Sequence, residues 1–153
     1  MNPQIEILRK TRANVLEQIK DLTNEQLNYV AEGFNNNIIW NLGHMIATQQ
    51  GMSYRRAGLP TIITDDFWEK YRTGSKPDGL AGENEALQIR ELLFTTLDKF
   101  EIDYDKKIFG NYTAWSTRSG VEIASIDDSL RFLPYHEGLH SGTIIAMKKL
   151  VTK

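Results

Sequence analysis

The segment that decides the fold is Ile126–Val151, which reads IDDSLRFLPYHEGLHSGTIIAMKKLV. Its apolar residues recur at spacings of three and four, a pattern that predicts a long amphipathic helix. Ser125, with Asp128 three residues further on, forms a relaxed capping box at the start of this helix. Pro134 removes one backbone hydrogen bond from the helix, so we expect one helix bent near Leu130 rather than two separate helices.

Three other segments carry the same helical periodicity: Pro3–Leu22, Asn37–Ala57 and Glu83–Glu101. Asn35 or Asn36 is the expected N-cap of the second segment, because an asparagine side chain accepts hydrogen bonds from the first backbone amides of a helix. Together with the last helix, these segments predict an all-α fold, a four-helix bundle within a single domain over residues 1–153.

Two connections of this bundle are longer than bundle loops usually are. The connection between the second and third helices, Thr61–Gly82, contains Asp65, Asp66, Phe67, Trp68 and Tyr71, and we expect a short helical turn there. The connection between the third and fourth helices, Ile102–Ala124, is expected to form a short hairpin. Long connections in compact domains are usually functional or disordered.

Composition excludes several classes of protein. The chain has 153 residues, a net charge of -2 and no cysteine, which excludes disulfides, thiolate metal ligands and a cysteine nucleophile. Neither the charge nor the aromatic pattern suggests a nucleic-acid partner. The N-terminus lacks the apolar core of a signal peptide, and no run of 18 apolar residues suggests a membrane span. We therefore expect a cytoplasmic protein.

The chain has only three histidines, His44, His136 and His140. His136 and His140 lie four residues apart, so they share one helix face one turn apart. His44 has mostly small or apolar neighbours one turn away, which favours an inward orientation. A lone interior histidine is more often a hydrogen-bonded core residue, and it is the three together that favour a metal site. We expect one divalent ion, Zn²⁺ or Ni²⁺ first and Fe²⁺ as a third candidate.

The run His136–His140 also matches H-E-x-x-H, the zinc metalloprotease signature, in which the glutamate is the general base. That match ends after five residues. Thr143 stands where the longer metzincin signature requires glycine, and no histidine, aspartate or glutamate follows His140 to act as a third ligand. A protease is therefore a weak interpretation.

Two stretches resemble the DinB-like family, also called the YfiT-like metal-dependent hydrolases: NIIWNLGH at residues 37–44 and FLPYHEGLHSG at residues 132–142. The resemblance lies in one histidine after a tryptophan-containing run and an H-x-x-x-H pair in the last helix. It implies a four-helix bundle, a three-histidine metal site, frequently a homodimer, and hydrolase or thiol-dependent S-transferase activity. Thr143 departs from the pattern, because many relatives carry a glutamine near this position.

Three polar residues near the histidines have two interpretations each. Glu137 is either a catalytic base beside the metal ligands or a carboxylate in solvent or at an interface. Asn41 and Thr48 lie about one turn from His44 and could orient a ligand or simply form the polar lining of the bundle.

Four residues of the Thr61–Gly82 connection, Asp65, Asp66, Trp68 and Tyr71, could form a lid over the metal, although Trp68 and Tyr71 are more often loop anchors. Gly43 and Gly51 each cost a helix about 1 kcal/mol relative to alanine, which is best explained by the close approach of another helix. Gly142 invites the same explanation.

Three functions follow from these observations. The first is a metalloenzyme that activates water or a small thiol for attack on a small-molecule substrate. The second is a non-catalytic bundle stapled by the ion, and the third is an interaction module whose histidines are incidental. The sequence favours them in that order.

Overall fold

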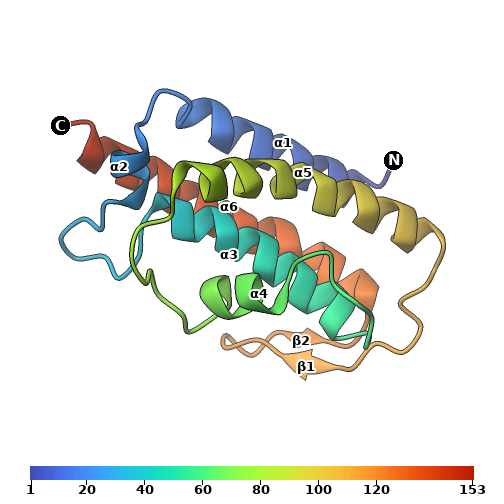
Figure 1. Ribbon diagram of the computed structural model, residues 1–153. Helices are drawn as coiled ribbons and strands as arrows, with labels where there is room; N and C mark the ends of the chain where they lie inside the picture. Colours follow the sequence, from blue (N-terminus) through green and yellow to red (C-terminus); the bar gives the residue numbers. More distant parts are fainter.

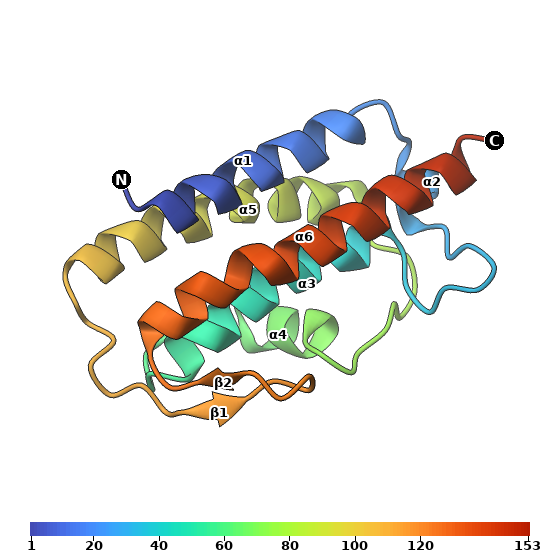
Figure 2. The same cartoon turned by 180° about the vertical axis from the view of Figure 1, so that it is seen from behind.

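Four long helices form the frame of the molecule, whose computed structural model describes residues 1–153. They are α1 (Pro3–Gln18), α3 (Ile38–Gln50), α5 (Glu83–Asp105) and α6 (Ile126–Val151). α1 packs against α5 and α6, and α3 packs against the same two helices. α3 and α5 run in one direction and α1 and α6 in the other (Figures 1 and 2). The predicted all-α four-helix bundle is therefore confirmed.

The sequence places α6 correctly from end to end. The helix runs without a break through Pro134, and the Ser125 side chain caps it by accepting a hydrogen bond from the Asp128 amide at 3.2 Å. One helix, rather than two, is confirmed. The continuity of α6 matters because His136 and His140 lie just beyond the proline.

The predicted second helix differs from the structure at both ends. Its N-cap is Asn37, not Asn35 or Asn36, because the Asn37 Oδ1 accepts a hydrogen bond from the Trp40 amide at 2.8 Å. After Gln50 the helix widens into one π-helical turn, η1 (Gly51–Arg55). Such turns in α-helices are frequent at functional sites.

The remaining boundaries differ more modestly from prediction. α1 ends at Gln18, before Leu22, and α5 continues to Asp105, beyond Glu101. A short helix, α2 (Asn24–Asn28), was not predicted. Its signal was present, because Thr23 and Gln26 form a capping box in which each side chain binds the other residue's backbone amide.

Both long connections contain the structure that the sequence predicts. α4 (Asp65–Tyr71) lies within the connection from α3 to α5, where it covers α3. A two-stranded antiparallel hairpin, β1 (Trp115–Ser116) and β2 (Glu122–Ile123), lies within the connection from α5 to α6. The hairpin lies at the end of the bundle where α6 begins (Figure 2).

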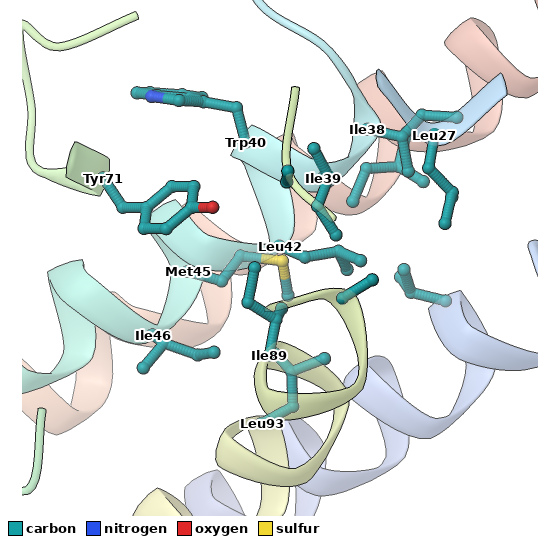
Figure 3. Packing of buried hydrophobic residues seen from close by; sticks show 14 of the residues in the cluster. Leu27, Ile38, Ile39, Trp40, Leu42, Met45, Ile46, Tyr71, Ile89 and Leu93 are labelled. Carbon is teal, nitrogen blue, oxygen red and sulfur yellow. The ribbon is translucent and has the colours of Figure 1, made fainter. Parts of the chain in front are cut away.

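Buried aliphatic side chains hold α3 against α5. Leu42, Met45 and Ile46 of α3 point towards Ile89 and Leu93 of α5, and all five are fully buried (Figure 3). Burying each such side chain stabilises the fold by about 1.5–3 kcal/mol. No helix of this fold combines the length and apolar character needed to cross a membrane.

Candidate metal centre

The structure brings His44, His136 and His140 together. One ring nitrogen from each histidine lies within 4.8 Å of those of the other two. His44 comes from α3, and the other two project from successive turns of α6, which packs against α3. Their ring centroids are 4.5–5.3 Å apart. The arrangement suits three imidazoles that face one ion.

Two of the three rings are oriented by hydrogen bonds on their Nδ1 nitrogens. His44 Nδ1 lies 2.8 Å from the carbonyl oxygen of Tyr71, and His140 Nδ1 lies 2.7 Å from the Asn41 side-chain oxygen. Both partners accept, so Nδ1 carries the proton in each ring and Nε2 keeps its lone pair. Metal-binding histidines are typically oriented in this way.

The amide orientation of Asn41 is itself determined by its neighbours. The Asn41 nitrogen Nδ2 donates to the backbone oxygen of Asn37 at 2.8 Å and to the side-chain oxygen of Asn36 at 2.9 Å. Only the oxygen Oδ1 can therefore face His140. Of the two interpretations of Asn41, orienting a ligand or lining the bundle, the geometry fits the first, and the group that Asn41 contacts is the His140 ring.

The third ring, that of His136, has a buried nitrogen without a partner. His136 Nδ1 is inaccessible to solvent and makes no hydrogen bond. Such orphaned polar atoms are rare in folded proteins because burial removes their hydrogen bonds to water without replacement. The donor set and this unpaired nitrogen both fit a divalent ion at the cluster.

All three imidazoles are neutral at physiological pH. Burial lowers the pKa of His136 to about 3, with smaller contributions from His140, His44 and Arg12. Burial, with His44 nearby, lowers the pKa of His140 to about 4. Burial also lowers the pKa of His44, against an opposing hydrogen bond to Tyr71. Neutral imidazole is the form that binds metal.

Two glycines allow α4 to lie close to α3. A Cβ atom at Gly43 would lie 2.4 Å from the ring of Tyr71, and one at Gly51 would lie 2.5 Å from the ring of Trp68. The predicted close approach is confirmed at both positions, and it places the Tyr71 carbonyl against His44. The same prediction of a close approach is wrong for Gly142, because nothing lies within 4 Å of a Cβ atom placed there.

Glu137 lies neither beside the metal ligands as a base nor in solvent, the two places that the sequence suggested. Its side chain is fully buried, and both carboxylate oxygens accept hydrogen bonds from the Arg12 Nε at 3.1 Å. The remaining Arg12 donors reach Glu137 again, the Leu93 carbonyl oxygen and the Thr96 hydroxyl. Burial raises the pKa of Glu137 and the charge of Arg12 opposes that shift. A carboxylate that is bound on both oxygens is not placed to act as a base.

The predicted lid residues divide into two groups. Tyr71 packs on Gly43 of α3 and Trp68 packs on Gly51 at the start of η1, and Trp68 also lines the space beside the histidines. Asp65 is almost fully exposed and pairs with Arg55, and Asp66 is exposed as well. The aromatic half of α4 therefore contacts the site, and the acidic half faces solvent.

A cavity of about 1020 Å³ adjoins the cluster. His44, His136 and Thr48 form part of its wall, and the Thr48 hydroxyl lies 3.2 Å from His44 Nε2. The other walls come from η1, α4, the hairpin and the first half of α6; α4, α6 and the two strands are labelled in Figure 1. This volume accommodates a small organic molecule next to His44 and His136.

Comparison with known proteins agrees with this architecture. A search of curated proteins found no match to the chain. A comparison with protein-family models matches residues 7–144, a span that includes all three histidines, to the DinB superfamily. Since this match covers most of the 153 residues, the chain belongs to the DinB superfamily.

Proposed function

We propose that this protein is a metal-dependent enzyme that binds one divalent ion through His44, His136 and His140. The ion would activate water or a small thiol for attack on a small-molecule electrophile. The observation that carries the proposal is the convergence of three neutral imidazoles, two of which, His44 and His136, line a cavity of about 1020 Å³. Zn²⁺ and Ni²⁺ are the first ions to test, and Fe²⁺ is the third.

The ligand set favours an open site over a structural staple. Structural zinc sites are normally closed by four protein ligands, whereas catalytic sites keep one position for water or substrate. Here only three candidate ligands cluster, and the neighbouring carboxylate of Glu137 is bound to Arg12. Because no fourth protein ligand is in place, an ion held here would have a free position.

An ion in this site supplies Lewis acidity, which lowers the pKa of an activated nucleophile and stabilises the negative charge that develops during attack. The chain's own residues favour a thiol over water as that nucleophile. No aspartate or glutamate lines the cavity, and imidazoles that bind a metal have no lone pair left to accept a proton. A thiol ionises near pH 8.5, so it can lose its proton to form the nucleophile without a protein side chain acting as base.

Metal analysis of the purified protein without a histidine tag tests the site. We expect about one equivalent of divalent ion for the unmodified chain. His44→Ala, His136→Ala and His140→Ala should each lose most of it, while the control Thr143→Ala on the same helix should retain it. Full metal content in all three histidine variants would overturn the proposal.

Cobalt substitution tests whether the site is open. We expect the visible spectrum of the Co²⁺ protein to change when L-cysteine or imidazole is added, because a free position admits a new ligand. S-conjugation of 1-chloro-2,4-dinitrobenzene with L-cysteine then provides an activity assay, with the metal-free protein as control. A Co²⁺ spectrum that ignores both ligands would indicate a closed, structural ion instead.

The homodimer remains a separate proposal that rests on the family resemblance. The mass in solution, measured by light scattering at micromolar concentration, tests it. A mass of 17.5 kDa, that of one chain, would overturn it.

A further inference from the structure

The cavity beside the histidines has a charge opposite to that of the whole chain. Four arginines, Arg55, Arg56, Arg72 and Arg118, are among its 18 lining residues, and no aspartate or glutamate is. The chain as a whole has 18 basic and 20 acidic residues and a net charge of -2. Because field lines concentrate in a cavity lined by one sign of charge, this space attracts anions.

Two of these arginines already have carboxylate partners outside the cavity. Arg55 pairs with Asp65 at 2.7 Å and lies over the Trp68 ring at 4.3 Å. Arg72 pairs with Glu69 at 2.7 Å. Their charges are partly compensated, so they contribute mainly to the general potential of the cavity.

Arg56 and Arg118 have no such partner. Neither forms an ion pair with any residue of the chain. The guanidinium carbon of Arg56 lies over the Trp115 ring, 4.8 Å from its centroid, a cation–π contact between two residues that line the cavity. Two guanidinium groups are thus free to bind a carboxylate or phosphate through paired N–H donors.

Hydrogen bonds hold together the two chain segments that carry these arginines. The Thr113 amide donates to the Arg56 carbonyl oxygen at 2.7 Å, and the Tyr112 hydroxyl donates to the Met52 carbonyl oxygen at 2.7 Å. These bonds tie the segment before β1 to η1 and the residue after it. Arg118 lies in the turn of the same hairpin, closed by the hydrogen bond from the Thr117 amide to Val121.

We propose that this cavity binds a small organic anion, with its carboxylate or phosphate held by Arg56 and Arg118. Its uncharged part would lie along Trp115, Trp68 and Tyr135 towards His44 and His136, since all five residues line the same cavity. That this anion is the substrate or thiol co-substrate rests on the proposed function. Its binding to the arginines does not, because neither arginine belongs to the histidine cluster.

Calorimetric titration of the metal-free full-length protein tests this site separately from the ion. The probes are succinate, inorganic phosphate and, as the uncharged analogue of succinate, succinamide, all at constant ionic strength. We expect succinate or phosphate to bind and succinamide not to bind. Arg56→Ala and Arg118→Ala should each weaken binding by about tenfold or more, as expected for a lost charged hydrogen bond. Arg90→Ala, which removes an arginine of α5 outside the cavity, should not.

The outcomes discriminate clearly. Tighter binding of succinate assigns a carboxylate ligand, and tighter binding of phosphate assigns a phosphorylated one. Binding of neither below about 10 mM overturns the proposal, and so does an equal loss in Arg90→Ala. Binding that appears only after metal is added would place the anion on the ion instead, which would overturn the arginine site and leave the proposed metal function standing.

Discussion

Two successive residues of α6, His136 and Glu137, take part in polar sites of opposite character. His136 points into the three-histidine cluster, where its Nδ1 has no hydrogen-bond partner and the adjoining cavity is large. Glu137 points towards α1, where Arg12 binds both its oxygens and nothing is accessible to solvent. Adjacent positions lie about 100° apart around a helix, so one helix can serve both sites.

The two sites differ in how many of their buried polar atoms have hydrogen-bond partners within the protein. All three guanidinium nitrogens of Arg12 donate within the protein, to Glu137, the Leu93 carbonyl oxygen and the Thr96 hydroxyl, and the pair is closed to solvent. In the histidine cluster, by contrast, the buried Nδ1 of His136 has no partner. A buried polar site that is fully paired holds helices in register, whereas one that is left unpaired requires something from outside the chain.

Breaking the closed pair should produce the largest effect. Arg12→Ala leaves the Glu137 carboxylate buried without a partner, and we expect the free energy of unfolding to fall by about 3–5 kcal/mol. Arg9→Ala on the same helix removes a partly exposed ion pair with Asp98 and should cost at most about 1 kcal/mol. Urea denaturation measures both. An equal loss of stability in the two variants would contradict the view that Arg12 compensates a buried charge on Glu137.

Lowering the pH should have the next largest effect, because protonation of the histidine cluster destabilises the folded protein. Burial lowers the pKa of His136 to about 3 and of His140 to about 4, whereas an unperturbed histidine titrates near 6.5. Between pH 6.5 and 4 the unfolded chain therefore binds protons that the folded chain does not, so the stability of the metal-free protein falls as the pH falls. Urea titrations in EDTA from pH 8 to 4 measure this, and His136→Ala should give a flatter dependence. An equal slope in that variant would contradict the assignment.

Sequence reasoning found the open site more readily than the closed one. His136 and His140 are separated by one helical turn, a local signal, and their helix was placed correctly through Pro134. The partner of Glu137 lies 125 positions away, a distance over which periodicity carries no information. A signal did exist, because Arg12 interrupts the apolar stripe of α1 between Leu8 and Val15, and a charge in that stripe requires a buried partner.

The smaller elements show the same limit. The proline-containing helix, the turn at α4 and the hairpin follow from local patterns, and all three were predicted. The cavity and its arginines were not, because Arg56 and Arg118 come to line one cavity only when the segment before the hairpin is bound to η1 and Arg56. The cavity side of the molecule is therefore assembled from contacts between segments that are distant in sequence.

Removing the support of one histidine should weaken metal binding without removing a ligand. Asn41→Ala takes away the acceptor that orients His140, and we expect the dissociation constant for Zn²⁺ to rise about 10–100-fold. Competition with a chromogenic chelator measures it. Asn36→Ala, which removes only a neighbour of Asn41, should have a smaller effect. Unchanged affinity in Asn41→Ala would show that His140 is held by other contacts.

A change outside the ligands should disturb the open site through packing. A methyl group at Gly43 would meet the Tyr71 ring at 2.4 Å, so Gly43→Ala should push α4 away from α3. We expect a loss of about 1–3 kcal/mol in stability, as for other overpacked positions, together with weaker metal binding because the Tyr71 carbonyl no longer orients His44. Zinc competition and urea denaturation measure the two effects. A loss of stability with unchanged metal affinity would separate α4 from the site.

The smallest expected effect has the opposite sign and comes from Gly142→Ala. Gly142 lies inside α6, two residues after His140, and is surrounded by open space. Alanine favours a helix over glycine, so the variant should gain about 0.5–1 kcal/mol in stability and keep its metal affinity. Comparison with Gly43→Ala then shows whether a glycine is required only where α4 packs against it. A loss of stability that grows with protein concentration would instead indicate that a second copy of the chain packs closely on this face of α6, and would favour the proposed homodimer.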